Sequence, residues 1–328
     1  MKLITFLPST DAYSSGTASR KARLGAALDN GRVLDLAKVE PQFSGVTMLD
    51  FVRDADVHVP RARALLAMLP ELSSSAFHDI RRVNILAPLP RPVSVRDGYA
   101  FRRHVETARR NRGLPMIPEF DQFPVFYFSN HLSVIGPGEL RVGRRRLERL
   151  DFELEAFAVI GTPVLNPTLE EADAAIFGYG VMNDFSARAL QTEEMKLNLG
   201  PAKGKDFATA MGPWLVTKDE LASRTIRSPK GDVIHARMAA EVNGVPLSEG
   251  DLSEMDWTFA QIIQRAADGV KLTPGEVIGS GTVGSGCFLE LNGSKVTNDQ
   301  WLKQGDEVSL TIEGLGTLTN RIVEDPTR

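Results

Sequence analysis

Three carboxylates alternate with apolar residues in the stretch LDFELEAFAVIG, which covers residues 150–161. Asp151, Glu153 and Glu155 are each two positions apart, and a two-residue period places side chains on one face of a β-strand. Like charges that neighbour each other on a strand face repel. Such a face is either solvated by water or held together by a cation, and the pattern on its own leaves both interpretations open.

A divalent cation is the interpretation that would involve chemistry. The backbone positions of Glu153 and Glu155 would lie roughly 6.5–7 Å apart on a strand, so both carboxylates can lean onto one ion between them. Hard cations such as Mg²⁺ and Ca²⁺ need several oxygen ligands, which paired carboxylates commonly supply. The stretch is therefore a candidate part of a metal site, with Asp151 one pleat further along the same face.

A second candidate segment is VRDGYAFRRH, residues 95–104, which supplies Asp97, Tyr99 and His104. An aspartate can bind a metal, and an imidazole exchanges a proton near neutral pH, so it suits general-base catalysis. A single histidine is also commonly a surface or structural residue. The segment therefore predicts a metal ligand and a general base only if other site residues lie close to it in the fold.

Two more segments carry polar residues where strands are predicted to end or begin. Asp184 follows the apolar run GYGVM and precedes a predicted helical turn that holds Arg188 and Gln191. It would either point into a cleft or act as the N-cap of that turn. Lys205 lies in the loop GPAKGKDF, whose small residues let the backbone approach a ligand closely.

The secondary structure that would position these residues begins with a group of predicted strands near the N-terminus. Residues 2–7 and 24–36 have strand patterns, and the sequence DNG inside the second predicts a hairpin turn. Residues 47–55 and 61–72 have helical patterns. Together they predict a small unit built mainly on strands.

A proline-rich segment marks the end of this unit. NILAPLPRP, residues 84–92, contains three prolines, which interrupt both helices and central strands. We therefore predict a small β-rich N-terminal domain over residues 1–88 and a catalytic domain over residues 89–328.

Strand patterns recur through the second part of the chain, with few helices between them. The predicted strands cover residues 123–130, 150–161, 174–184 and 307–323. Residues 168–177 and 256–268 are predicted helices, the second with Asp256 as its N-cap. This order predicts an α+β protein, mostly β, with a mixed or antiparallel core rather than a βαβ array.

Composition and charge argue against several classes of protein. The 328 residues carry a net charge of −4, which gives no signal for binding nucleic acid or an anionic membrane. Cys287 is the single cysteine, so no internal disulfide forms, as is compatible with a reducing cytosol. No apolar run reaches the 18 or so residues of a membrane helix, and residues 1–16 lack the apolar core of a signal peptide. We expect a cytoplasmic protein with no nucleic-acid or membrane partner.

Taken in chain order, these segments resemble the fumarylacetoacetate hydrolase family over residues 93–291. Each segment alone is a weak signal, but five of them in the family's order are specific. The matching positions are Asp97, Tyr99 and His104 in an Asp-x-Tyr-x4-His segment, Glu153 and Glu155 in a Glu-x-Glu strand, Asp184, Arg188 and Gln191 in an Asn-Asp-x-Ser-Ala-Arg-x-x-Gln segment, Lys205 and Thr209 in a lysine loop, Thr282 in a Gly-Thr loop, and a closing Glu290.

The resemblance implies a metal-dependent enzyme on that family's mixed β-roll, with a small N-terminal domain and a homodimeric assembly. The implied metal ligands are Asp97, Glu153, Glu155 and Asp184. An all-oxygen site of this kind admits Mg²⁺, Ca²⁺ or Mn²⁺. His104 would be the general base, oriented by Glu290.

The resemblance also implies roles for the remaining matched residues. The implied catalytic residues are His104, Glu290, Lys205, Arg188 and Gln191, and the implied substrate-binding residues are Tyr99, Arg112, Tyr127, Thr209 and Thr282. At Arg112 the register is open, because Arg109 and Arg110 compete for the same position. Met195 stands where the hydrolases often have a tyrosine, so the resemblance does not carry over the contact made there.

The position of one glutamate favours one type of base within the family. Acylpyruvase-like members carry a His-x-x-Glu pair on a lid, whereas here Glu106 is only two residues after His104. This spacing favours a His104 base that is assisted by Glu290.

The implied activity is hydrolytic cleavage of a C–C bond in a 1,3-dicarbonyl or 2,4-dioxo acid, such as fumarylacetoacetate or an acylpyruvate, in aromatic or amino-acid catabolism. Two substrate oxygens would chelate the metal, which polarises the carbonyl and stabilises the enolate that leaves. The alternative within the family is an isomerase, decarboxylase or hydratase that acts on a hydroxydienoate or oxo-diacid. A metal-binding protein without activity is a third alternative, but such a protein would lack one of the residues named above.

Overall fold

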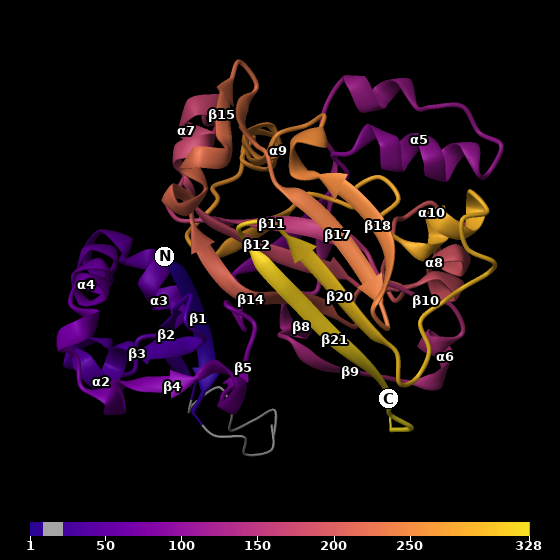
Figure 1. The fold of residues 1–328 in the computed structure, drawn as a ribbon. Helices are drawn as coiled ribbons and strands as arrows, with labels where there is room; N and C mark the ends of the chain where they lie inside the picture. The colour runs from indigo at the N-terminus through magenta and orange to yellow at the C-terminus, as the bar shows by residue number, and fades with distance from the viewer. Residues whose placement is uncertain (9–21, 328) are drawn as a thin grey trace.

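Two β-sheets dominate the protein (Figure 1). The computed structural model describes residues 1–8 and 22–327, so residues 9–16 of the N-terminal stretch 1–16 lie outside the described residues. Within the described part, the larger sheet has 12 strands and the smaller has five. No helix among the described residues is both long and apolar enough to cross a lipid bilayer.

The strands follow each other across the larger sheet in an order that differs from the chain order. The main path runs β4 (Phe77–Asp79), β3 (Arg32–Asp35), β2 (Arg23–Ala27), β1 (Lys2–Leu7), β14 (Thr209–Thr217), β12 (Ile176–Asp184), β11 (Leu154–Ile160), β19 (Glu276–Gly279), β6 (Ser94–Gly98) and β7 (Phe126–Ser129), with β5 (Asn84–Ile85) beside β1 and β8 (Val134–Ile135) beside β14. The smaller sheet runs β18 (Val245–Asp251), β17 (Arg237–Val242), β20 (Glu307–Ile312), β21 (Gly316–Glu324) and β9 (Gly138–Val142).

Two strand pairs and several helices complete the described structure. The pairs are β10 (Leu150–Asp151) with β13 (Ser186–Ala187), and β15 (Thr225–Ser228) with β16 (Gly231–Ile234). The α-helices are α2 (Leu36–Val39), α3 (Met48–Arg53), α4 (Ala55–Ala67), α5 (Arg102–Arg110), α6 (Arg144–Leu147), α7 (Leu169–Ala174), α8 (Arg188–Met195), α9 (Phe259–Ala266) and α10 (Phe288–Gly293).

The pairing is mixed, as predicted. Most neighbouring strands are antiparallel, whereas β19 with β6, β14 with β8 and β21 with β9 are parallel. In β20 the positions alternate between buried and more exposed, which is the two-residue period predicted for this part of the chain. The α+β class with a mixed, mostly β core is therefore confirmed.

The two sheets pack against each other over a shared hydrophobic core. Strands β12 and β14 of the larger sheet contact β20 and β21 of the smaller one. Leu154 and Val181 from the larger sheet and Leu310, Ile312 and Leu318 from the smaller belong to one buried cluster. Because both faces of β11 are covered, every residue of that strand is buried.

The stretch 150–161 is not one continuous strand, which corrects the prediction. Strand β10 ends at Asp151 and β11 begins at Leu154. The two backbone N–H groups in between donate to side chains: Phe152 to Asp151 Oδ1 at 2.9 Å, and Glu153 to Asn183 Oδ1 at 3.0 Å. These side chains take the place of a neighbouring strand, so the ladder breaks where the carboxylates lie.

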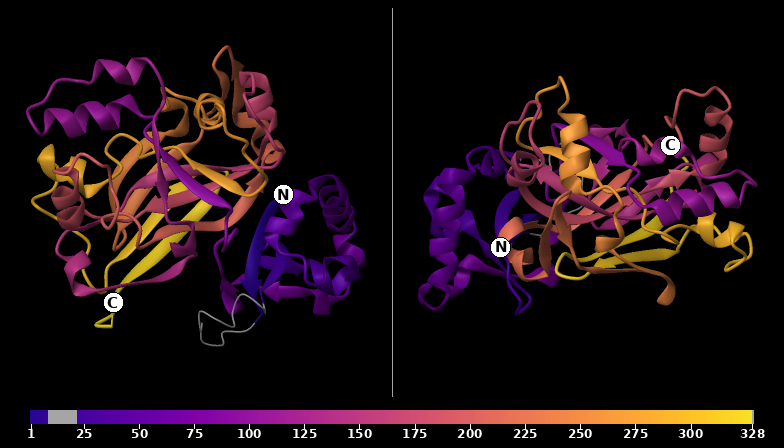
Figure 2. Two further views of the ribbon diagram at one scale, coloured as in Figure 1. Left: turned by 180° about the vertical axis from the view of Figure 1, so that it is seen from behind. Right: turned by 90° about the horizontal axis from the view of Figure 1, so that it is seen from above.

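The N-terminal unit extends the larger sheet at one side. In the views from the front, from behind and from above it lies beside the two-sheet body (Figures 1 and 2). Strand β1 pairs with β14, with Leu3 opposite Leu215. One hydrophobic cluster contains Leu3 and Phe51 of this unit together with Phe157 and Leu215 of the body. The sheet and its core therefore continue across residue 88, and the domain boundary there stays a prediction.

The start of α9 differs from its prediction. Thr258, and not Asp256, is the N-cap, and its hydroxyl accepts the backbone N–H of Gln261 in a reciprocal capping box. Asp256 Oδ2 instead accepts the backbone N–H of Arg102 at 2.8 Å, at the first residue of α5. The aspartate thus caps a helix that is far away in the sequence and that carries His104.

We predict that Leu215→Ala destabilises the N-terminal unit and the body together. Leu215 is fully buried in the cluster that both share, so removing its side chain should cost about 2–5 kcal/mol of unfolding free energy. Denaturant titration followed by circular dichroism and by fluorescence measures this loss. Leu165→Ala, at an exposed leucine, is the control and should change stability little. Separate transitions of the two units would contradict the shared core.

Candidate active site

The register of the larger sheet brings distant residues to one place. Asp97 on β6 lies opposite Gly279 of β19 on one side and Tyr127 of β7 on the other. Asp184, the last residue of β12, lies opposite Thr209 of β14. Helices α5, α8 and α10, together with β10, lie on the side of the molecule away from the N-terminal unit (Figure 1).

Three buried carboxylates form a tight cluster at this place. Asp97, Glu153 and Glu155 each offer an oxygen within 4.8 Å of the other two. A Cβ atom added at Gly279 would overlap the Asp97 carboxylate, so glycine is needed there for the aspartate to point into the cluster. The face of carboxylates predicted from the sequence is therefore buried and not solvated.

Crowding of negative charge changes how these groups ionise. Burial, and then the charge of Asp184, raises the pKa of Asp97 to about 7. Burial, and then the charge of Asp97, raises the pKa of Glu155 well above its ordinary range. Both carboxylates are therefore held in a site that lacks sufficient positive charge for them.

Glu153 is the member of the cluster that cations neutralise. Lys205 Nζ lies 2.5 Å from Glu153 Oε2 and 2.6 Å from Asp184 Oδ2, and Arg188 donates from a terminal nitrogen to Glu153 Oε1 at 2.6 Å. Burial by itself would raise the pKa of Glu153, but Lys205 and then Arg188 outweigh it and hold the pKa at about 2. Glu153 is thus an anion that orders both cations.

The donor set fits a hard divalent cation. Glu155 Oε2 and Asp184 Oδ1 are buried without a hydrogen-bond partner, and each oxygen of Glu153 keeps a second lone pair beside its cationic donor. Unsatisfied buried oxygens are costly, and oxygen ligands in this number are what Mg²⁺ or Mn²⁺ requires. Asp184 lies outside the tight group of three and is linked to it through Lys205.

A histidine–carboxylate dyad lies beside this cluster. His104 on α5 makes a short hydrogen bond from Nδ1 to Glu290 Oε1 on α10, and both side chains are buried. The backbone N–H of Ser285 donates to the other Glu290 oxygen at 3.1 Å. The Tyr99 ring packs edge-on against the His104 ring, with 5.4 Å between their centroids. These contacts fix the imidazole on two sides.

Two predicted substrate-binding residues, Tyr127 and Thr282, and the predicted catalytic residue Gln191 lie at the cluster, and each forms a hydrogen bond with a charged residue there. The Tyr127 hydroxyl donates to Asp184 Oδ2, and the Thr282 hydroxyl donates to Glu155 Oε1 at 3.1 Å. Gln191 Oε1 accepts from Arg188 at 2.9 Å. In this arrangement these side chains hold the charged residues in place, and contact with a substrate stays a prediction for them.

Thr209 and Arg112 make their hydrogen bonds outside the carboxylate cluster. The Thr209 hydroxyl is 3.2 Å from the Ser129 hydroxyl, on the strand next to Asp184. Arg112 is exposed just beyond α5, and its Nε donates to the carbonyl of Ala108 at 3.0 Å. The structure therefore does not bring Arg112 into the buried cluster.

Sequence reasoning missed one contact that holds the Lys205 loop. Glu194, near the end of α8, accepts the backbone N–H groups of residues 202–204 at 2.6–3.1 Å. This ties the loop before Lys205 to the helix that carries Arg188. No motif marks the contact, because a glutamate near a helix end is an ordinary surface residue in a sequence.

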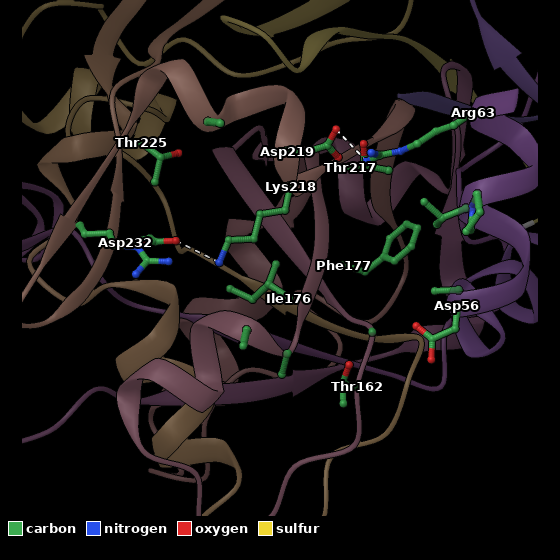
Figure 3. A pocket seen from close by; sticks show the side chains of 18 residues that line it. Asp56, Arg63, Thr162, Ile176, Phe177, Thr217, Lys218, Asp219, Thr225 and Asp232 are labelled. Atoms are coloured by element: carbon green, nitrogen blue, oxygen red, sulfur yellow. Dashed lines mark ion pairs between the residues drawn. The ribbon is translucent and has the colours of Figure 1, made fainter. Parts of the chain in front are cut away.

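The large cavity shown in Figure 3 lies elsewhere. It has a volume of about 720 Å³ and opens between α4 and the edge of the body. Four of its charged residues form two ion pairs, Arg63 with Asp219 and Lys218 with Asp232, each at 2.9 Å. None of the predicted site residues lines it, and it offers no cluster of unpaired carboxylates comparable to the one at Glu155.

The chain is similar to proteins of one known family. The family model for the C-terminal part of fumarylacetoacetate (FAA) hydrolase matches residues 94–323. The chain belongs to the fumarylacetoacetate hydrolase family. This matched region contains every predicted metal and catalytic residue of the site.

Relatives within the family carry different activities in their names. An oxaloacetate tautomerase of Bacillus subtilis is 26% identical over 94% of this chain and 99% of its own length. The fumarylacetoacetase of Oryza sativa is 31% identical over 71% of this chain and 69% of its own. The structure of maleylpyruvate hydrolase from Sphingobium sp. SYK-6, in complex with manganese(II) and pyruvate, covers 99% of both chains with a TM-score of 0.68 at 18% identity. The family thus includes hydrolases and tautomerases of small molecules.

We predict that Glu155→Gln removes bound metal. The amide loses an anionic oxygen and turns an N–H group toward the cation, so elemental analysis after dialysis against Mn²⁺ should fall from about one ion per chain to a small fraction of it. Glu276→Gln changes another buried carboxylate, one paired with Arg96, and should keep the metal. Unchanged metal content in Glu155→Gln would place the site elsewhere.

The protein without metal should lose stability as pH rises from about 4 to 7. The folded pKa of Asp97 is about 7, above its ordinary 3.8, so the stability linked to this group is present at low pH and disappears as the group ionises. A divalent cation binds the ionised form and competes with the proton. The rise in Tm on adding Mg²⁺, measured by differential scanning fluorimetry, should therefore be larger at pH 8 than at pH 5. An equal rise at both pH values would contradict this linkage.

Proposed function

We propose that this protein is a divalent-metal-dependent hydrolase that cleaves a C–C bond in a 1,3-dicarbonyl or 2,4-dioxo acid. The observation that carries the proposal is the buried hydrogen bond between His104 Nδ1 and Glu290 beside the carboxylate cluster. A hydrolase must deprotonate water, and an imidazole oriented by a carboxylate is suited to that step. The homodimer implied by the family resemblance is part of the same proposal.

The orientation of His104 determines which nitrogen acts as the base. An ionised Glu290 accepts the proton on Nδ1, so Nε2 keeps a free lone pair. Nε2 takes a proton from water while the water oxygen bonds to the substrate carbonyl carbon. As the C–C bond breaks, its electron pair stays with the departing enolate, and the proton on Nε2 passes to the enolate carbon. Water is then added across the bond, which gives a carboxylic acid and a ketone or oxo acid.

Arg188 and Lys205 supply fixed positive charge for the oxyanions that form. Both side chains are buried, and their partners Glu153 and Asp184 hold them in place before the substrate arrives. Loss of one preorganised donor of this kind lowers kcat by about 10²–10³-fold in enzymes where it has been tested. When bound at the four predicted ligands, Mg²⁺ or Mn²⁺ (or Ca²⁺) would polarise the carbonyl and stabilise the enolate.

A tautomerase, or another isomerase, decarboxylase or hydratase of the family, is the second candidate. The nearly full-length match to the oxaloacetate tautomerase of Bacillus subtilis favours it. The same dyad would then carry a proton between carbon and oxygen, and no water would be added to the substrate. The two candidates share the site and differ in whether water reaches the carbonyl carbon.

Product analysis in ¹⁸O-labelled water separates the candidates. A panel of 2,4-dioxo acids with defined Mg²⁺ is incubated with the protein and analysed by mass spectrometry. Hydrolysis gives two fragments, with ¹⁸O in the new carboxylic acid, and is the expected result. A product of unchanged mass, or one that has lost CO₂, would replace the hydrolase proposal by the corresponding alternative.

We predict that His104→Ala lowers kcat by about 10²–10⁴-fold, because the general base is removed. Metal content should be unchanged, since His104 is not a predicted ligand. His235→Ala, which alters an exposed histidine on another part of the chain, is the matched control and should retain activity. Full activity in His104→Ala, measured at saturating substrate, would refute the assignment of the base.

A further inference from the structure

Asp151 is the carboxylate of the opening stretch for which the family resemblance gives no role. It is completely buried, and it accepts four hydrogen bonds. Oδ1 accepts the backbone N–H groups of Phe152 at 2.9 Å and Phe288 at 2.7 Å. Oδ2 accepts Arg188 Nε at 2.8 Å and the backbone N–H of Leu289 at 3.0 Å.

These bonds join two parts of the candidate active site. On one side, the Arg188 guanidinium that Asp151 holds through Nε also donates to Glu153 and to Gln191. The guanidinium is therefore fixed in a plane between the carboxylate cluster and α8. Because a guanidinium is rigid, fixing Nε also fixes the two terminal nitrogens that face Glu153 and Gln191.

On the other side, Asp151 holds the first turn of α10. Phe288 and Leu289 are the first two residues of that helix, and their N–H groups have no partner within the helix itself. Glu290 is the next residue, and its carboxylate makes the hydrogen bond to His104. The direction in which Glu290 leaves the helix therefore depends on the bonds to Asp151.

The chemistry of these contacts requires a carboxylate at position 151. All four partners are donors, and an ionised carboxylate accepts on both oxygens without offering a proton. An asparagine would turn its NH₂ group toward two donors, either the pair at Oδ1 or the pair at Oδ2. Substitution by asparagine keeps the size of the side chain and breaks one half of the link.

We propose that Asp151 is a positioning residue that fixes the Arg188 guanidinium and the Glu290 carboxylate relative to each other. This inference rests on the proposed function, because it assigns to Asp151 the geometry of the base and of the oxyanion cation in that reaction. Asp151 acts through those two residues and holds neither the metal nor the substrate itself.

The test combines kinetics of Asp151→Asn with a double-mutant cycle. Asp151→Asn should lower kcat by about 10–100-fold, as loss of a supporting hydrogen bond does at comparable sites, with metal content unchanged. In the Glu290→Gln background the same substitution should lower kcat by a smaller factor than in the wild-type protein, because the part of the effect that passes through Glu290 is already lost. Multiplicative effects of the two substitutions would overturn the proposal.

Proton NMR detects the hydrogen bond between His104 and Glu290 without any substrate. The buried hydrogen bond between the His104 imidazole and the Glu290 carboxylate should give a downfield proton resonance in the wild-type protein, which is lost in Glu290→Gln. Asp151→Asn should shift or broaden this resonance, whereas the control Glu276→Gln should leave it in place. An unmoved resonance in Asp151→Asn would overturn the proposal even if the protein hydrolyses no oxo acid, so this test and that of the proposed function fail separately.

Folding of the variant is checked by circular dichroism and thermal unfolding. If Asp151→Asn does not fold, Asp151→Ser replaces it, because the shorter side chain breaks the link without placing an NH₂ group against the donors. The same shift in the dyad resonance is expected from Asp151→Ser, and its absence would again contradict the proposal.

Discussion

An excess of buried negative charge is the constraint on which the rest of this structure depends. Six carboxylates are buried in or beside the site, against two permanent cations: Asp97, Asp151, Glu153, Glu155, Asp184 and Glu290 against Arg188 and Lys205. Burying an uncompensated carboxylate costs several kcal/mol, so the arrangement is stable only if each charge is paired, protonated or bound to a metal. Glu153 is paired with cations, the raised pKa values of Asp97 and Glu155 favour their protonated forms, and metal binding is the solution that we propose for the oxygens left without a partner.

The carboxylates have different hydrogen-bond and ion-pair partners, and each therefore has a different role. Glu153 takes both cations and stays ionised, whereas burial and then the charge of Asp97 raise the pKa of Glu155. Asp151 receives four donors, and Glu290 receives the imidazole. Glu155 Oε2 and Asp184 Oδ1 are buried without a hydrogen-bond partner, and both residues are among the four predicted metal ligands. The larger sheet supports this arrangement: Glu155 and Asp184 lie on the adjacent strands β11 and β12, and Asp97 lies on β6, with only β19 between β6 and β11.

Much of the site was predictable because its residues lie in short segments with fixed spacing. Glu153 and Glu155 share one face, and the order of the five segments indicated the family. The elements were also predictable where a two-residue or helical period is uninterrupted, as in β20 and α9. What the sequence could not show is tertiary: Asp256 caps a helix 154 residues earlier in the chain, and Asp151 reaches Phe288 and Leu289, which are 137 and 138 residues away. The strand break after Asp151 has partly the same origin, since the side chain of Asn183 accepts the backbone N–H of Glu153 in place of a ladder partner.

The position of a bound cation tests the charge argument most directly. A crystal structure of the protein grown with Mn²⁺ and measured at the manganese absorption edge gives an anomalous peak at the ion. The account predicts a single strong peak within about 2.0–2.6 Å of oxygens from Asp97, Glu153, Glu155 and Asp184. It also predicts that Lys205 remains bonded to Glu153. A peak outside this cluster, or none with the four carboxylates unchanged, would contradict it.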